Sequence, residues 1–181
     1  MEIVDLADRR DLIGQVAGML FDGFRSRWPD AWPDLASSTC EVNESLGEDR
    51  ISLVAVIEDQ AVGWIGAIPT YGHAWELHPL VVAADRRGAG IGGALVEGLE
   101  RRIAAAGGGT IYLGTDDQDG STTLSGIDLY PDPVSHLSRL EGDHPFQFYL
   151  KRGYALVGVI PDANGPGQPD ILMARRIAKA T

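Results

Sequence analysis

Two acid–base groups lie just ahead of a glycine-rich turn in the stretch WELHPLVVAADRRGAGIGGAL, residues 75–95. Glu76 and His78 lie in an apolar segment that has the character of a strand. The turn that follows is basic and leads into an apolar helix, so its backbone N–H groups and the helix N-terminus suit phosphate oxygens. A phosphate-binding turn beside acid–base groups predicts an enzyme that uses a phosphate-bearing cofactor.

The glycine turn fits two phosphate-binding patterns. Its residues from Gly88 to Gly93, GAGIGG, match G-x-G-x-x-G, which alone is a weak signal for dinucleotide binding. That fingerprint usually follows the first strand of its domain directly, whereas here the turn lies near the middle of the chain, behind the polar residues ADRR. The second pattern, Arg87-x-x-Gly90-x-Gly92, is therefore favoured. A glycine-rich connector without a ligand is the remaining alternative, which the two adjacent arginines make less favourable.

Composition bounds the class of protein. A chain of 181 residues is long enough for one domain over residues 1–181 with a sizeable core. The formal net charge of −11 argues against nucleic acid and anionic membranes as partners and favours cationic ligands. The single cysteine, Cys40, excludes an intrachain disulfide and is typical of a reducing compartment. The sequence has neither a signal-peptide pattern nor a membrane-length apolar run, so we expect a cytoplasmic protein, and we predict no metal site.

The hydropathy pattern predicts both helices and strands. We expect strands at residues 2–6, 51–58, 61–71, 75–83, 110–115, 154–160 and 171–175. We expect helices at residues 11–28, 35–46, 90–106 and 145–152, with a polar loop at 116–143. Pro29 and Pro33 interrupt the chain between the first two helices. This order predicts an α/β (α+β) fold, a mixed central sheet with helices on both faces.

Several blocks of the sequence resemble a known enzyme family. Arg87-x-x-Gly90-x-Gly92 resembles the loop by which GNAT superfamily N-acetyltransferases hold the coenzyme A pyrophosphate. Longer blocks resemble chromosomal, homodimeric aminoglycoside 6′-N-acetyltransferases: VGWIGAIPTYGHAWELHPLVV, TIYLGTDDQDGSTTLSGIDLY, HPFQFYLKRGY and VGVIPDANGPGQPDILMA. The resemblance covers residues 50–177 and is poor over residues 1–49, which help to form the acceptor wall in the family. It implies a GNAT fold, acetyl-CoA as co-substrate, a cationic aminoglycoside as acceptor and a homodimer.

The strand at residues 75–83 carries the predicted reaction chemistry. Because side chains alternate along a strand, we expect Glu76, His78 and Leu80 on one face, and Leu77 and Pro79 on the other. Glu76 is the predicted general base for the acceptor amine, through water, or an anchor for its ammonium form. An exposed strand carboxylate without such a role is the alternative. The interpretation of His78 as a proton carrier and its interpretation as a packed, hydrogen-bonded histidine are equally supported.

The resemblance adds roles that spacing alone does not give. It implies a bulge in this strand that lets backbone N–H groups near Leu80–Val82 contact the cofactor, and we assign one of them to the oxyanion. It also implies that Tyr149 donates a proton to the departing thiolate, with simple packing against Phe146 and Phe148 as the alternative. The predicted catalytic residues are thus Glu76, His78, Leu80 and Tyr149. The predicted cofactor contacts are Leu80, Val81, Val82, Arg87, Gly88, Ala89, Gly90, Ile91, Gly92 and Gly93.

Acidic residues begin where the strand at 110–115 ends. Three aspartates within the four residues DDQD, in a strongly acidic chain, favour a site for a polycation over an ordinary solvated loop. Trp28 and Tyr71 are predicted to stack on sugar faces, unless they are core residues. The predicted substrate contacts are Trp28, Tyr71, Glu76, Asp116, Asp117, Asp119 and Glu141.

The predicted function follows from the resemblance. It implies transfer of an acetyl group from acetyl-CoA to the 6′-amine of an aminoglycoside by direct attack in a ternary complex, which gives antibiotic resistance. One alternative is an acetyltransferase for another amine, such as a polyamine or a protein lysine. A second is a non-catalytic protein that binds acyl-CoA or the drug. A nucleotide-dependent oxidoreductase is the least favoured.

Overall fold

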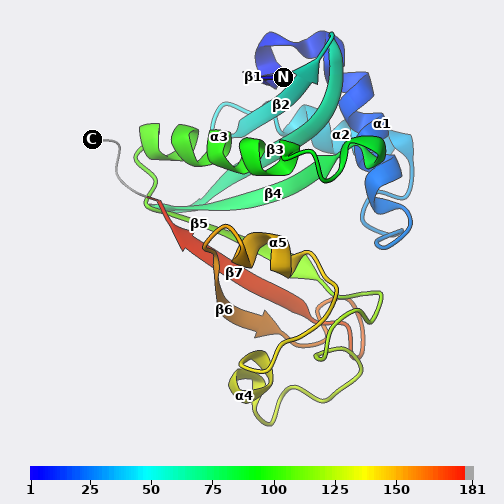
Figure 1. Cartoon of the computed structure of the whole chain (residues 1–181), viewed down its shortest axis with the longest axis vertical. Helices are drawn as coiled ribbons and strands as arrows, with labels where there is room; N and C mark the ends of the chain where they lie inside the picture. The colour runs from blue at the N-terminus through cyan, green and yellow to red at the C-terminus, as the bar shows by residue number, and fades with distance from the viewer. Residues whose placement is uncertain (178–181) are drawn as a thin grey trace. The chain divides into compact units, whose positions relative to one another are not determined.

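A computed structural model describes residues 1–177 of the chain (Figure 1). Its strands form one mixed seven-stranded sheet in the order β1-β2-β3-β4-β5-β7-β6. By their internal contacts the residues divide into two compact units, Met1–Ile111 with Ile177, and Tyr112–Arg176. The predicted fold class is confirmed, and the prediction of one domain over residues 1–181 stays a prediction.

The first unit contains most of the predicted elements. They are β1 (Glu2–Asp5), α1 (Ile13–Phe24), α2 (Leu35–Glu44), β2 (Ile51–Ile57), β3 (Gln60–Tyr71), β4 (Ala74–Val82) and α3 (Ile91–Ala105). Strand β5 (Thr110–Asp116) begins in this unit and continues into the second. The second unit adds α4 (Pro133–Leu137), α5 (Phe146–Leu150), β6 (Ala155–Ile160) and β7 (Asp170–Arg176).

Two predictions are wrong for local reasons: the extent of the first helix and the absence of a helix from the long loop. The first helix was expected at residues 11–28, but α1 is shorter, because a 3-10 turn at Arg10–Leu12 precedes it and hydrogen-bonded turns follow Phe24 before Pro29. The predicted loop at 116–143 contains the short helix α4. Asp132 caps this helix by accepting a hydrogen bond from the Ser135 N–H at 3.1 Å, and Pro133 occupies its first turn.

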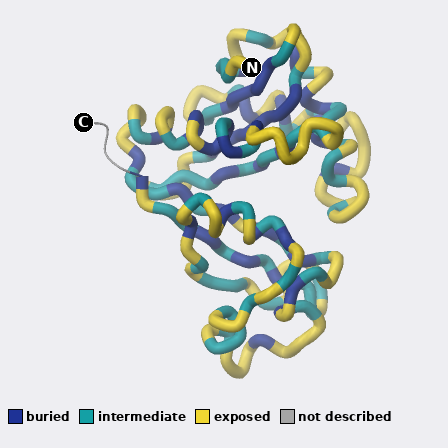
Figure 2. The backbone as a smooth tube through the Cα atoms, viewed as in Figure 1, coloured by how far each residue is buried: buried dark blue, intermediate teal, exposed yellow. Residues whose placement is uncertain are grey.

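The core of the first unit lies on both faces of its strands, where buried residues are concentrated (Figure 2). Trp64 of β3 and Val81 of β4 belong to a buried cluster with Leu20 of α1. The opposite face packs on α3. A Cβ atom added to Gly63 would lie 2.9 Å from side-chain atoms of Ile91 in that helix. The alternation of side chains along β3 thus separates an α1 face from an α3 face.

Strand β4 carries one residue more than β3 at its centre. Ile65 pairs with Leu80 and Ala67 pairs with Leu77, so that Gly66 alone is opposite His78 and Pro79. This is the β-bulge that the family resemblance implied. The peptide bond between His78 and Pro79 is cis.

The sequence predicted that Glu76, His78 and Leu80 lie on one face of the strand, but the bulge separates Leu80 from the other two. Residues directly opposite in an antiparallel pair share a face. Glu76 pairs with Ile68 on the α1 face, whereas Leu80 pairs with Ile65 on the α3 face. The prediction of a common face was wrong for Leu80 because the extra residue shifts the alternation by one position. Glu76 and His78 remain on the same face.

Gly66 allows this close approach of the two strands. A Cβ atom at residue 66 would lie 2.5 Å from the His78 carbonyl oxygen, which belongs to the backbone and cannot rotate away. We expect Gly66→Ala to lower the free energy of unfolding by about 1–3 kcal/mol, as overpacked sites do. Chemical denaturation measures the change. Gly72→Ala is the matched control, because no atom lies within 4 Å of the added Cβ there. Equal stability of the two variants would contradict the prediction.

Candidate functional site

The turn before α3 has the backbone of an anion-binding site. Gly88 and Gly90 have φ angles of +80° and +82°, which side chains with a Cβ rarely adopt. Gly90 is the N-cap of α3, and the first hydrogen bond of the helix runs from the Ala94 N–H to the Gly90 carbonyl at 3.1 Å. The N–H groups of residues 91–93 therefore lie outside the helix's own hydrogen-bond ladder, at the positive end of its dipole. This geometry fits a phosphate group.

The two arginines of the turn differ in their contacts. Arg86 forms an ion pair with Asp85 at 3.3 Å. The Arg87 side chain turns back toward β4, and its Nε donates to the Val82 carbonyl at 3.4 Å. This contact holds the guanidinium of Arg87 at the end of β4, where its positive charge attracts an anion.

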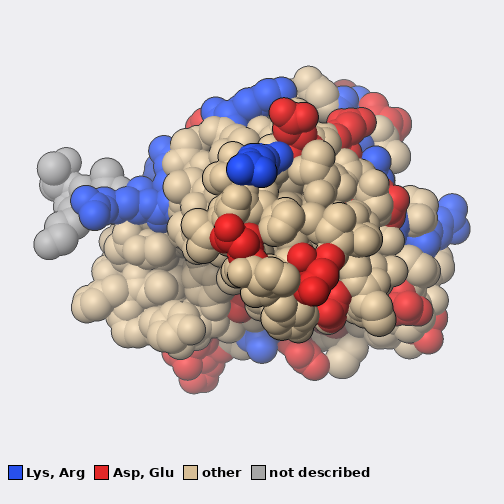
Figure 3. All heavy atoms as spheres, turned by 90° about the horizontal axis from the view of Figure 1, so that it is seen from below, with Lys and Arg blue, Asp and Glu red and all other residues tan. Residues whose placement is uncertain are grey.

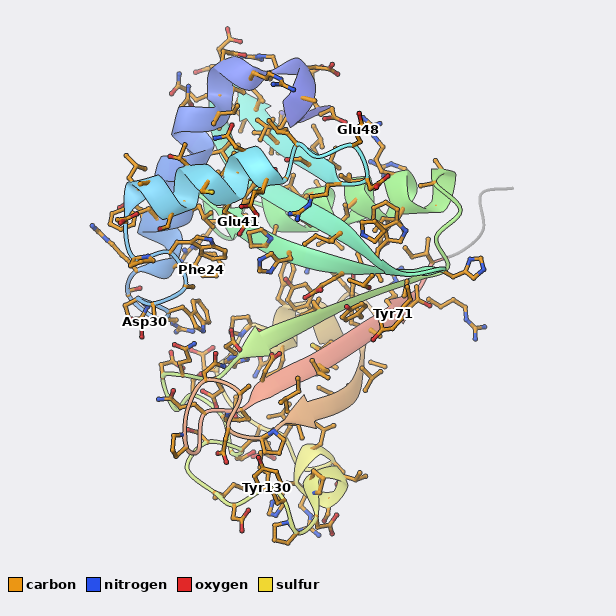
Figure 4. The ribbon with its side chains drawn as sticks, turned by 180° about the vertical axis from the view of Figure 1, so that it is seen from behind. Phe24, Asp30, Glu41, Glu48, Tyr71 and Tyr130 are labelled. Atoms are coloured by element: carbon orange, nitrogen blue, oxygen red, sulfur yellow. The ribbon has the colours of Figure 1, made fainter. Side chains whose placement is uncertain are left out.

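His78 on the α1 face of β4 lies beside two residues that the sequence analysis missed. Its Nε2 lies 3.8 Å from Glu41 Oε1, and its side chain is 42 % exposed. The indole Nε1 of Trp32 donates to Glu41 Oε2 at 3.4 Å. Glu41 comes from α2 and is labelled with Phe24 in Figure 4. No local pattern links residues so far apart in the sequence, although the repeated Trp-Pro pair was a signal that this segment is not an ordinary connector.

Aromatic rings extend this cluster toward the end of α1. The Phe24 ring lies 4.7 Å from Trp32 in an edge-to-face arrangement and 5.2 Å from Trp28. Trp28, a predicted substrate contact, is half-buried here. Tyr71, the other predicted aromatic contact, is 74 % exposed at the far end of β3, well away from Phe24 and Glu41 in Figure 4. The structure therefore does not bring Trp28 and Tyr71 together.

In the second unit, Asp117 organises the loop after β5. Its side chain is fully buried. Oδ1 accepts from the Ser121 N–H at 2.8 Å, and Oδ2 accepts from the Thr122 N–H at 3.0 Å and the Thr122 hydroxyl at 2.5 Å. The Thr122 hydroxyl in turn accepts from the Leu124 N–H at 3.1 Å. A buried carboxylate with these donors stabilises the loop conformation.

Asp116 and Glu141 lie nearer the surface of the same unit. Asn164 donates from Nδ2 to Asp116 Oδ1 at 2.5 Å. Glu141 is exposed, and its backbone exchanges hydrogen bonds with Thr123 beside the loop. Asp119 is also exposed. Acidic side chains form several separate groups on the face in Figure 3, with basic side chains between and around them.

His144 connects β5 to α5. Its Nε2 lies 2.9 Å from the Asp116 carbonyl oxygen, which can only accept, so Nε2 carries the proton. Its Nδ1 accepts from the Phe146 N–H at 3.3 Å. The surrounding protein thus fixes the tautomer of this buried histidine, which orients the start of the helix that carries Tyr149.

Tyr149 is buried within the second unit. Its ring contacts Phe148 and Tyr154 edge-on, with centroids 5.0 and 5.4 Å away. Burial raises the pKa of the Tyr149 hydroxyl well above its ordinary value, and the positive charge of Arg152 opposes this only in part. The phenol therefore stays protonated through the neutral range, so its hydroxyl carries a proton that it can donate.

Residues 1–177 contain neither a membrane-spanning helix nor a metal-binding cluster. No helix in this range is both long and apolar enough to cross a membrane. Within the same range, no three His, Cys, Asp or Glu side chains are grouped so as to hold a metal ion.

Comparisons with known proteins give consistent results. A model of the acetyltransferase (GNAT) family matches residues 16–124. A crystal structure of an aminoglycoside 6′-N-acetyltransferase complexed with coenzyme A is 46 % identical, with a TM-score of 0.90, and the match covers 100 % of this chain and 99 % of that chain. The aminoglycoside 6′-N-acetyltransferase from Enterococcus faecium is 45 % identical, with a TM-score of 0.88 and the same coverage. The aminoglycoside 6′-acetyltransferase type Ii is 39 % identical, with a TM-score of 0.74 and full coverage of both chains. None of the curated proteins compared with the chain matches it.

Asp117→Asn tests the role of the buried carboxylate. The substitution replaces one acceptor oxygen by an NH₂ group that faces backbone N–H or hydroxyl donors. We expect the free energy of unfolding to fall by about 1–3 kcal/mol, the effect of leaving a buried group without its partner. Hydrogen exchange at the Ser121 and Thr122 amides should become faster. Asp143→Asn, at an exposed site of the same unit, is the control. Unchanged exchange at both amides would argue against the role.

Proposed function

The chain belongs to the acetyltransferase (GNAT) family, and we propose that it transfers the acetyl group of acetyl-CoA to the 6′-amine of aminoglycoside antibiotics. The observation that carries the proposal is the full-length similarity, at 46 % identity and a TM-score of 0.90, to an aminoglycoside 6′-N-acetyltransferase complexed with coenzyme A. Acetylation makes a charged amine neutral, so such an activity would give resistance to the drug.

We assign the cofactor site to the glycine turn and the end of β4. The N–H groups of residues 91–93 and the charge of Arg87 suit a pyrophosphate. Gly88 and Gly90 supply the left-handed backbone that the turn requires. Backbone groups of residues 80–82 complete the proposed site, alongside Ala89 and Ile91.

The proposed reaction gives separate roles to Glu76, Leu80 and Tyr149. Acetyl-CoA supplies the acetyl group as a thioester when it is bound. Glu76 accepts the proton of the attacking amine, directly or through water, and the Leu80 N–H donates to the oxyanion. Tyr149 donates its proton to the thiolate leaving group. The high pKa that burial gives this phenol keeps it protonated through the neutral range, so that its O–H is available to donate to the sulfur as negative charge develops there.

The acidic residues divide into two roles in this proposal. Asp116, Asp119 and Glu141 attract the polycationic drug to the second unit. Asp117 instead holds the loop in shape, because its buried oxygens already accept hydrogen bonds from that loop. Trp28 supplies an aromatic face for a sugar ring. Tyr71 keeps its proposed role of stacking on a sugar face, because its ring is exposed and is not part of the core.

We further propose that the enzyme is a cytoplasmic homodimer that binds neither nucleic acid nor membranes. Two apolar side chains on β6, Val157 and Ile160, are 57 % and 47 % exposed. Strand β6 is an edge of the sheet, so a second copy can cover these side chains. The net charge of −11 repels nucleic acid and anionic lipid.

The first test of the proposed function is which amino group of the drug becomes acetylated. Kanamycin A and tobramycin, which carry a 6′-amine, should be acetylated, and an analogue with a 6′-hydroxyl should not. Spermidine and a lysine peptide serve as competing acceptors. Mass spectrometry is the suitable assay, because the exposed thiol of Cys40 would also react with a thiol reagent. Acetylation at another amino group of the drug, or preferential turnover of spermidine or the peptide, would refute the proposal.

Tyr149→Phe keeps the ring packing and removes only the hydroxyl. We expect acetylation in a single turnover to slow about tenfold or more, which corresponds to about 1.4 kcal/mol of barrier. Since burial raises the pKa of this hydroxyl, the ratio of the wild-type and variant rates should stay constant from about pH 6 to about pH 9. A wild-type rate in the variant would remove Tyr149 from the mechanism. Tyr130→Phe, at an exposed site in the same unit, is the control.

A further inference from the structure

Glu41 contacts two nitrogen-bearing rings through different oxygens. Oε2 accepts the indole N–H of Trp32 at 3.4 Å, and Oε1 lies 3.8 Å from His78 Nε2. Trp32 is 8 % exposed and packs in the core cluster of the first unit, with the Phe24 ring edge-on against it. Because the indole is fixed by packing, it fixes in turn which way the carboxylate of Glu41 points.

The burial of Glu41 gives its charge a larger effect than a surface carboxylate has. Its side chain is 18 % exposed, whereas exposed ion pairs are weakened by water and salt. The next acidic residue on α2, Glu44, is exposed and accepts from the Cys40 thiol at 3.4 Å. Glu76 lies two residues before His78 on the same face of β4. Glu41 thus presents a partly shielded carboxylate oxygen to Nε2 of the imidazole.

A carboxylate near one ring nitrogen determines the tautomer of a neutral histidine. An ionised carboxylate only accepts hydrogen bonds, so it favours a proton on the nitrogen that it faces. That nitrogen is Nε2 in His78. The other nitrogen, Nδ1, is then left with a lone pair and can accept a hydrogen bond. At 3.8 Å the pair is longer than a direct hydrogen bond, and catalytic contacts of this kind commonly shorten when a substrate binds.

We propose that Glu41 is a positioning residue that holds His78 as the Nε2–H tautomer and so leaves Nδ1 to accept an N–H or O–H group of the acceptor substrate. This rests on the proposed function for the existence of that substrate. Trp32 supports this role of Glu41, because its indole N–H orients the carboxylate. The assignment distinguishes Glu41 from Glu76, which handles the proton of the attacking amine directly.

We expect Glu41→Gln to change the tautomer of His78 in a defined direction. The Trp32 indole needs an acceptor, so the amide oxygen should take the place of Oε2 and the NH₂ group should face His78. A donor then faces Nε2 of the ring, and the neutral imidazole should move toward the Nδ1–H tautomer. Nitrogen-15 shifts of labelled histidine, measured at about pH 8 where an ordinary imidazole is neutral, separate the two tautomers.

The protein supplies its own controls. Of the four histidines, His144 is held as Nε2–H by the Asp116 carbonyl and should not change. Glu44→Gln removes the same charge from the same helix and should leave the tautomer of His78 as in the wild type. Glu41→Ala, which removes both contacts, should give a mixture of tautomers. A His78 tautomer that is the same in the wild type and in both Glu41 variants would overturn the proposal.

Kinetics test whether the effect reaches the reaction. We expect Glu41→Gln to lower kcat/KM for the acceptor roughly five- to twentyfold, with the KM for acetyl-CoA unchanged. Because Glu41 acts through His78, adding Glu41→Gln to His78→Gln should have no further effect. Additive losses would mean that Glu41 contacts the substrate itself and would refute the positioning role. The tautomer measurement needs no substrate. If the wild type fails to acetylate any aminoglycoside, the proposed function fails, and the tautomers still decide the assignment of Glu41.

Discussion

The contact between Gly66 and the His78 carbonyl is the constraint on which the arrangement around His78 depends. Side chains of even-numbered and odd-numbered residues lie on opposite faces of a regular strand. Val81 belongs to the core beneath α1, so without the extra residue His78 would face α3. The bulge lets β4 present His78 to the α2 side and still bury Val81 in the α1 core. The bulge is needed here because His78 and Val81 are three residues apart, and Gly66 leaves room for it.

The same face then receives a segment that is distant in sequence. Helix α2 begins at a capping box in which Asp34 and Ser37 satisfy each other's backbone N–H groups. This fixes where the helix starts, and Glu41 follows two turns later on the side of Trp32. The tryptophan is both a core residue and a hydrogen-bond donor to Glu41. Trp32 therefore links the core to the arrangement around His78. A substitution that disturbs the packing of Trp32 should also disturb the position of Glu41.

The sequence predicted the element order and the glycine turn because both depend on local pattern. Gly88 and Gly90 adopt positive φ angles, which glycine permits more readily than other residues, so a tight turn could be expected there from residue type. The assumption of strict alternation put Leu80 on the wrong face of β4. The position of a bulge depends on how a strand pairs with its partner, which the sequence of the strand itself does not show. Glu41 was missed for a similar reason, since its relation to His78 exists only after α2 packs on β4. Pro79 was the one local signal of the irregularity, because proline has no N–H group to donate to a partner strand.

Acidic residues show most clearly what composition cannot decide. Asp116 and Asp117 are neighbours in a run that suggests a cation site, yet one pairs with Asn164 and the other is buried under its own loop. Net charge governs long-range attraction of a ligand, which depends little on the exact position of each carboxylate. The function of an individual carboxylate depends on the donors that surround it. Asp117 faces backbone N–H groups and therefore shapes a loop, whereas Glu41 faces two rings and therefore can set the state of one of them.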